Sequence, residues 1–163
     1  MAEAMRIVHP IPPLFDENSR VLILGSFPSV KSREARFFYG HPQNRFWKLM
    51  ARLFSEEIPV TVEEKTSLIL RHHLALWDTI HSCTIVGSSD SSIKDVVPND
   101  LGVILGNSRV ERIFCNGTAS YTLYQKYILP QNGIPAVKLP STSPANAAWS
   151  PDRLAEAWRV ICE

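Results

Sequence analysis

Apolar residues form four short runs along the chain, and each run is followed by a polar residue or a proline. The runs cover residues 20–25, 74–77, 112–115 and 136–139. The first of them, Arg-Val-Leu-Ile-Leu-Gly, has no polar face, which is typical of a strand buried on both sides in a parallel sheet. We therefore predict four strands.

The segments between these runs repeat their apolar residues every three or four positions, as one face of a helix does. Helices are predicted over residues 43–54, 61–71, 100–105 and 119–127, with a last helix that begins at Pro151. Thr61 and Glu64 have the spacing of a capping box at the start of the second helix. Asn99 is an N-cap candidate for the third.

Four strands that alternate with helices predict an α/β fold: a three-layer α/β/α sandwich with a central, mainly parallel four-stranded sheet. The 163 residues fit a single domain, in which the Pro-rich residues 1–18 form an irregular N-terminal arm. Ligands of such sheets bind beyond the carboxyl ends of the strands. The loops expected to carry the function are residues 25–44, 78–95, 116–118 and 140–146.

The net charge of the chain is close to zero, because 17 Lys and Arg balance 16 Asp and Glu. This argues against a protein that coats nucleic acid through its total charge. Residues 31–52 nevertheless hold six basic residues and one acid, Glu34, whereas four glutamates gather just downstream. The pattern predicts a local basic strip beside the first loop.

Cysteine and histidine positions match no common metal site. The three cysteines are dispersed and form no CxxC pair, so we expect no disulfide framework, iron–sulfur cluster or structural zinc. No HExxH motif occurs. Four histidines are interpreted as surface or loop residues: His9, His72, His73 and His81. The sequence therefore predicts no metal and no cofactor.

No apolar run approaches the ~20 residues of a membrane-spanning helix. The first residues, MAEAMRIVHPIPPLF, lack the apolar stretch and cleavage site of a signal peptide. We expect a cytoplasmic protein that has no membrane contact.

The first loop contains the most unusual residues of the chain. It begins with Gly25-Ser-Phe-Pro-Ser29, which is not a P-loop because no GK[ST] follows. Residues 37–47 then read Phe-Phe-Tyr-Gly-His-Pro-Gln-Asn-Arg-Phe-Trp. Three consecutive aromatic side chains either fill the core or stack on a flat ligand such as a base.

These segments resemble the uracil-DNA glycosylase superfamily. The strand with Gly25–Ser29 and the HPxNRFW segment looks like its first motif, in the form of the mismatch-specific uracil/thymine branch. Leu139-Pro-Ser-Thr-Ser-Pro-Ala-Asn146 resembles its second motif. Residues 76–83 and 87–93 are similar to the hypoxanthine-DNA (deoxyinosine) glycosylase branch, and the resemblance spans residues 20–158.

The resemblance implies an enzyme that flips a deaminated base, most of all hypoxanthine, out of DNA. A positioned water then hydrolyses the N-glycosidic bond without a metal or organic cofactor. DNA with a damaged base is the implied partner, and we expect a monomer. A uracil or mismatch-specific glycosylase, or a non-catalytic DNA- or nucleotide-binding module on the same fold, remain the alternatives.

The same resemblance assigns roles to residues of the two motifs. Asn44 positions the water or the leaving base, although its place also suits a helix cap. Tyr39 stacks on the base. Outside the two motifs, Asp78 ends a predicted strand, so we expect it to accept a hydrogen bond from a purine N–H, unless it only caps a turn. The backbone of Gly25, Ser26 and Phe27 meets the base edge, with Phe27 as a pocket wall. The implied DNA contacts are Ser141, Thr142, Ser143, Asn146 and Arg45.

Two positions depart from the better-known branches. Phe27 stands where uracil enzymes carry Asp and mismatch enzymes carry Asn, and a phenyl ring cannot activate water. Ser141 stands where uracil enzymes carry a histidine in the second motif. Both departures favour the hypoxanthine branch.

Overall fold

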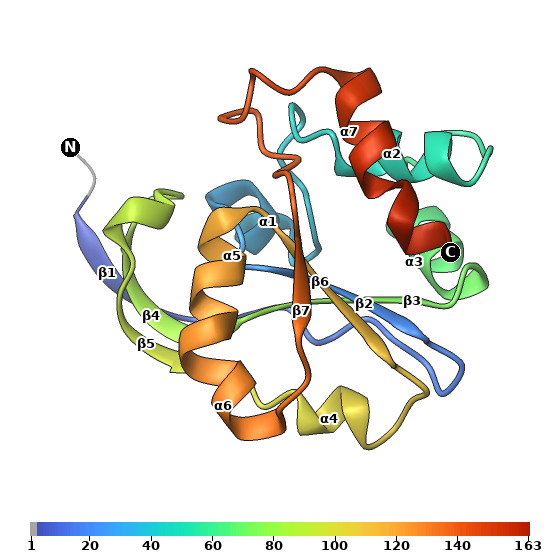
Figure 1. Cartoon of the computed structure of the whole chain (residues 1–163). Helices are drawn as coiled ribbons and strands as arrows, with labels where there is room; N and C mark the ends of the chain where they lie inside the picture. Colours follow the sequence, from blue (N-terminus) through green and yellow to red (C-terminus); the bar gives the residue numbers. More distant parts are fainter. Residues whose placement is uncertain (1–2) are drawn as a thin grey trace.

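A parallel sheet of four strands forms the centre of the computed structural model, which describes residues 3–163 (Figure 1). Its strands lie in the order β3-β2-β6-β7, and each neighbouring pair is parallel. Their bounds are Val21–Gly25 (β2), Leu74–Asp78 (β3), Arg112–Asn116 (β6) and Ala136–Leu139 (β7). The predicted sheet is confirmed, and every residue of β2 and β3 is buried, as their apolar runs indicate.

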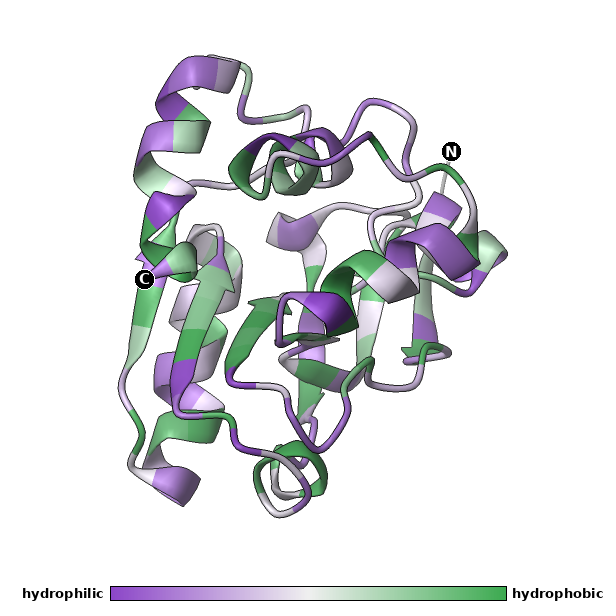
Figure 2. Ribbon diagram, turned by 90° about the vertical axis from the view of Figure 1, so that its right-hand side faces the viewer, coloured by the Kyte–Doolittle hydropathy of each residue, from purple (hydrophilic) through white to green (hydrophobic). Residues whose placement is uncertain are grey.

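Helices flank this sheet on both sides. Figure 1 shows α2, α3 and α7 together on one side and α5 and α6 on the other. The bounds are Phe46–Leu53 (α2), Val62–Arg71 (α3), Gly102–Leu105 (α4), Thr118–Leu123 (α5), Leu129–Asn132 (α6) and Pro151–Trp158 (α7). In Figure 2 the central strands are mostly hydrophobic, whereas the helices alternate between hydrophobic and hydrophilic residues, as expected of elements that cover a core. No helix within residues 3–163 has the length and hydropathy needed to cross a membrane.

Several helix boundaries differ from the predictions. The capping box of Thr61 and Glu64 is present at the start of α3. Asn99 is not an N-cap: its side chain donates to the carbonyl oxygens of Asp78 and Ile80, and the short α4 begins at Gly102. The helix predicted over 119–127 extends from Thr118 to Asn132, because a π-helical turn at Tyr124–Ile128 joins α5 to α6.

A second, antiparallel sheet corrects the prediction of an irregular arm and of a loop over residues 78–95. Strand β1 (Ala4–Val8) pairs with β4 (Ile80–Val86), which pairs with β5 (Lys94–Pro98). The strands were missed because β1 and β5 are largely exposed and β4 mixes polar with apolar residues, so none forms an apolar run. The predicted first loop also contains a short helix, α1 (Val30–Ala35), which is capped by Ser29.

Trp158 ties the last helix to the loop that follows β7. Its side chain is fully buried in the core, and its Nε1 donates to the carbonyl oxygen of Pro140 at 2.8 Å. The hydrogen bond fixes the point at which the loop of residues 140–146 leaves the sheet.

We predict that Trp158→Phe lowers the free energy of unfolding by about 2 kcal/mol or more, because it leaves the Pro140 carbonyl without its donor and removes packed volume. Chemical denaturation measures the effect. Trp149→Phe, at a half-buried position, is the matched control and should cost clearly less. Equal losses for the two variants would contradict the role given to Trp158.

Candidate functional site

A pocket of about 360 Å³ opens at the carboxyl ends of the central strands. Each of the four loops singled out in the sequence contributes to its wall. Gly25 ends β2, Asp78 ends β3 and Asn116 ends β6, while Ser141–Ala145 follow β7. Because parallel strands end at one edge of the sheet, residues far apart in the sequence meet here.

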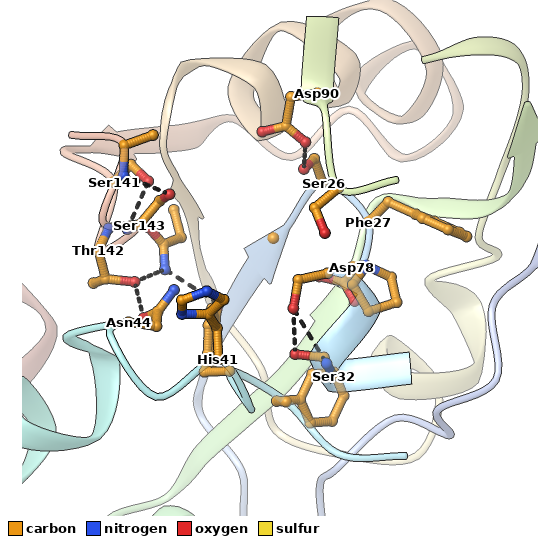
Figure 3. Close-up of a pocket in the computed structure, with 18 of the residues that line it drawn as sticks. Ser26, Phe27, Ser32, His41, Asn44, Asp78, Asp90, Ser141, Thr142 and Ser143 are labelled. Atoms are coloured by element: carbon orange, nitrogen blue, oxygen red, sulfur yellow. Dashed lines mark hydrogen bonds between the residues drawn. The ribbon is translucent and has the colours of Figure 1, made fainter. Parts of the chain in front are cut away.

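Asn44 lies in the wall with its side-chain oxygen already bonded. Its Oδ1 accepts from the backbone N–H of Phe46 at 2.9 Å and from the hydroxyl of Thr142 at 2.8 Å (Figure 3). The first contact satisfies the N–H of the first residue of α2, but the helix begins at Phe46 and not at Gln43, and its N-cap residue is Arg45 and not Asn44. Within residues 3–163 the amide Nδ2 has no hydrogen-bond partner, which leaves this donor available to a ligand.

Thr142 and Asn116 connect Asn44 to the other side of the pocket. Asn116 Nδ2 donates to Thr142 Oγ1 at 3.0 Å, and Asn116 Oδ1 accepts from the Thr142 N–H at 3.0 Å. The same Nδ2 donates to the hydroxyl of Tyr39 at 3.2 Å. Asn116 was not among the residues chosen from the sequence, although a polar residue directly after a buried parallel strand is a signal for it.

Tyr39 occupies the strained left-handed region of backbone space, with φ of 52°. One face of its ring stacks on Phe46, with centroids 4.0 Å apart and an interplanar angle of 17°. Burial, and then the negative charge of Asp78, raise the pKa of Tyr39, so the hydroxyl stays protonated. Its stacking on a base stays a prediction.

Asp78 is buried at the end of β3 and is bonded to a histidine from the N-terminal arm. His9 Nε2 lies 2.7 Å from Asp78 Oδ2, and the two side chains are 2% and 7% exposed. His9 does lie in a loop, directly after β1, but its side chain is buried and not on the surface. A Cβ on Gly25 would lie 2.3 Å from Asp78 Oδ1, so residue 25 must be glycine to admit this carboxylate.

The side chains of Ser26 and Phe27 point to different surroundings: Ser26 bonds to Asp90, whereas Phe27 packs in a core. Ser26 Oγ donates to Asp90 Oδ1 at 2.8 Å, and burial, with the charge of Asp78 as a smaller cause, raises the pKa of Asp90. The Phe27 ring packs in the small core under the antiparallel sheet and meets His9 edge-on at 5.9 Å. In Figure 3 this ring points away from Asn44, so the wall that Phe27 gives the pocket is chiefly backbone.

Arg45 and Asn146 stabilise the loop of residues 140–146 through hydrogen bonds to its backbone. The Arg45 guanidinium donates to the carbonyl oxygens of Ser143 and Asn146, both at 3.0 Å, and to that of Trp149. Asn146 Nδ2 donates to the Ser141 carbonyl at 3.1 Å. Neither residue lines the pocket, whereas Ser141, Thr142 and Ser143 do. The DNA contacts of these five residues stay predictions.

Metal ligands do not gather in the part of the chain from residue 3 onward: no group of three or more His, Cys, Asp or Glu side chains is arranged to hold an ion. The polar groups of the pocket wall are instead amides, hydroxyls, two carboxylates and the imidazole of His41.

Comparisons with known proteins agree with this geometry. Residues 12–162 match the family described as the uracil DNA glycosylase superfamily. The chain is 33% identical over 151 residues to a hypoxanthine DNA glycosylase of Methanosarcina acetivorans, covering 92% of this chain and 94% of that protein. It is also 33% identical over 94 residues to a hypoxanthine DNA glycosylase of Methanosarcina barkeri, covering 57% and 60% of the two chains.

A solved structure extends the likeness to the fold. The solution NMR structure of a proposed uracil DNA glycosylase from Methanosarcina acetivorans matches with a TM-score of 0.81 and 31% identity, over 97% of each chain. With the family match covering nearly all of the sequence and the two motifs meeting at one pocket, the chain belongs to the uracil DNA glycosylase superfamily.

Proposed function

We propose that this DNA glycosylase hydrolyses the N-glycosidic bond of hypoxanthine, as deoxyinosine, in DNA. Family membership and the relatives named hypoxanthine DNA glycosylase support the proposal. The observation that carries it is the free amide donor of Asn44, held in a base-sized pocket by the network of Thr142 and Asn116.

The reaction needs a positioned water and stabilisation of the departing base, because the transition state places positive charge on the sugar and negative charge on the base. Asn44 Nδ2 donates to the attacking water or to the departing base. Its direction is set in advance, because Phe46 N–H and the Thr142 hydroxyl hold the other end of the amide. A preorganised donor requires no rearrangement at the moment of reaction.

Asp78 supplies an acceptor for the base. Deamination of adenine replaces the bare N1 by an N1–H, which donates to a carboxylate, whereas the N1 lone pair of adenine is repelled by it. The backbone of Gly25, Ser26 and Phe27 lines the same wall and meets the base edge. Tyr39 offers an aromatic ring beside it, and stacking is worth about 1–3 kcal/mol per base.

The loop of residues 140–146 binds the DNA backbone. Ser141 and Ser143 carry short hydroxyl donors suited to phosphate oxygens. Arg45 and Asn146 act with them by holding the loop in shape. DNA with a damaged base is the proposed partner, and the monomeric state and cytoplasmic location stay predictions.

The substrate is tested by single-turnover cleavage of matched oligonucleotides that carry inosine, uracil, xanthine or a G·T mismatch. We expect inosine to be cleaved fastest, because the pocket pairs a carboxylate acceptor with the N–H that deamination creates. Preference for uracil or mismatched thymine would replace the substrate assignment. Cleavage of none, with DNA binding retained, would support the binding module that Phe27 in the usual catalytic position favours.

Asn44→Ser should lower the rate of inosine cleavage about 10²-fold or more, because serine keeps a helix-capping oxygen but has no amide donor. Binding of inosine DNA, measured by fluorescence anisotropy, should stay close to wild type. Gln43→Ala, at the exposed neighbouring position, is the control and should cleave normally. Wild-type cleavage by Asn44→Ser would remove Asn44 from the mechanism.

Ser143→Ala should weaken binding to inosine DNA and to undamaged DNA alike, because a phosphate contact carries no sequence information. We expect a loss of about ten-fold or less, the worth of one hydrogen bond to a charged group. Titrations at several salt concentrations measure it, with Ser91→Ala in the exposed loop of residues 87–93 as the control. A loss confined to inosine DNA would place Ser143 at the base instead.

A further inference from the structure

The N-terminal arm places one histidine beneath the pocket. His9 directly follows β1, and its backbone N–H donates to the carbonyl oxygen of His81 at 2.7 Å, which continues the pairing of β1 with β4. The imidazole lies edge-on between Phe27 and Trp77, at centroid distances of 5.9 and 6.4 Å. The side chain is 2% exposed, so its contacts are set by the protein and not by solvent.

The hydrogen bonds of His9 determine which ring nitrogen carries the proton. The backbone N–H of Ile11 donates to His9 Nδ1 at 3.2 Å, so Nδ1 presents a lone pair. A neutral imidazole then carries its proton on Nε2, which lies 2.7 Å from Asp78 Oδ2. His9 is therefore a donor to Asp78, and this hydrogen bond fixes the direction in which the carboxylate points.

The other oxygen of Asp78 is left for the pocket. Oδ1 lies beside Gly25, where the missing Cβ gives it room, and Asp78 is one of two carboxylates in the pocket wall. Asp90, the other, is already bonded to Ser26. Among residues 3–163 no donor is bonded to Asp78 Oδ1. This oxygen is therefore free to accept a hydrogen bond from a ligand in the pocket.

We infer that His9 is a positioning residue for substrate selection: through its hydrogen bond to Oδ2 it orients the Asp78 carboxylate so that Oδ1 receives the N–H of a deaminated base. The inference rests on the proposed function and deepens it, since it places part of the selectivity in the N-terminal arm. A base with an N–H at this edge gains a hydrogen bond. Adenine instead directs its N1 lone pair at the lone pairs of Asp78 Oδ1, and the two groups repel each other.

A purely structural His9 would act only through its ring, and phenylalanine would replace it well. His9→Phe keeps the edge-on packing against Phe27 and Trp77 and removes the donor. His9→Gln restores a donor, because a glutamine amide reaches about as far as Nε2. His81→Phe, exposed on β4, is the matched control.

Two quantities are measured for each variant. The first is the single-turnover rate of cleavage of inosine DNA. The second is the ratio of the binding constants of free hypoxanthine and 1-methylhypoxanthine, which lacks the N1–H. The wild type should prefer hypoxanthine. His9→Phe should cleave about ten- to hundred-fold more slowly and lose most of that preference, because an interaction with a charged group is disturbed. His9→Gln should recover most of both, and His81→Phe should match the wild type.

The outcomes separate this inference from the proposed function. Inosine DNA left intact by the wild type contradicts the proposed function, whereas the free-base preference still reports on His9. A preference retained in His9→Phe overturns the inference. In a double-mutant cycle with Asp78→Asn, His9→Phe should cause little further loss of preference, and additive losses overturn it.

One measurement uses the wild type alone, so it tests the inference even if His9→Phe does not fold. Nitrogen-15 spectra of histidine-labelled wild type should show a proton on Nε2 of His9. A ring without a proton on Nε2 overturns the inference, because it has nothing to donate to Asp78.

Discussion

The bonds of Thr142 hold the site together. Its side chain is buried, and its hydroxyl donates to Asn44 while it accepts from Asn116. Its backbone N–H also donates to Asn116, so Thr142 forms three hydrogen bonds to the two asparagines. The consequence is that the first motif, the end of β6 and the loop after β7 are aligned before any substrate binds. Preorganisation of this kind is the usual source of catalytic stabilisation by amide donors.

Arginine in the first motif has an internal role that total charge does not reveal. Arg45 is bonded to two backbone carbonyl groups of the loop of residues 140–146 and to that of Trp149, and the Arg33 guanidinium lies over the Phe27 ring. Part of the basic strip at residues 31–52 is thus committed to the fold. With a net charge of +1, the protein has little bulk attraction for phosphate, so the proposed binding of DNA relies on local contacts.

The two sheets contribute different parts of the pocket. The parallel sheet brings Gly25, Asp78 and Asn116 to one edge, as its strand order requires. The antiparallel sheet carries His9 at its own edge and positions Asp90 through the turn between β4 and β5. Asp78 is where they meet, since it ends a strand of one sheet and is bonded to the arm of the other.

Local patterns in the sequence determined the central strands, the capping box of α3 and the two motif loops, because burial on both faces, helix periodicity and turn residues act over a few neighbouring positions. Asn44 was chosen because the HPxNRFW segment resembles the first motif of the superfamily. The tertiary structure alone decided that His9 bonds Asp78, 69 positions away, and that Asn116 bonds Thr142, 26 positions away. It also decided that the exposed β1 is a strand, since its partner β4 lies far along the chain. Such contacts depend on how distant segments pair, and no local pattern of polar and apolar residues carries that information.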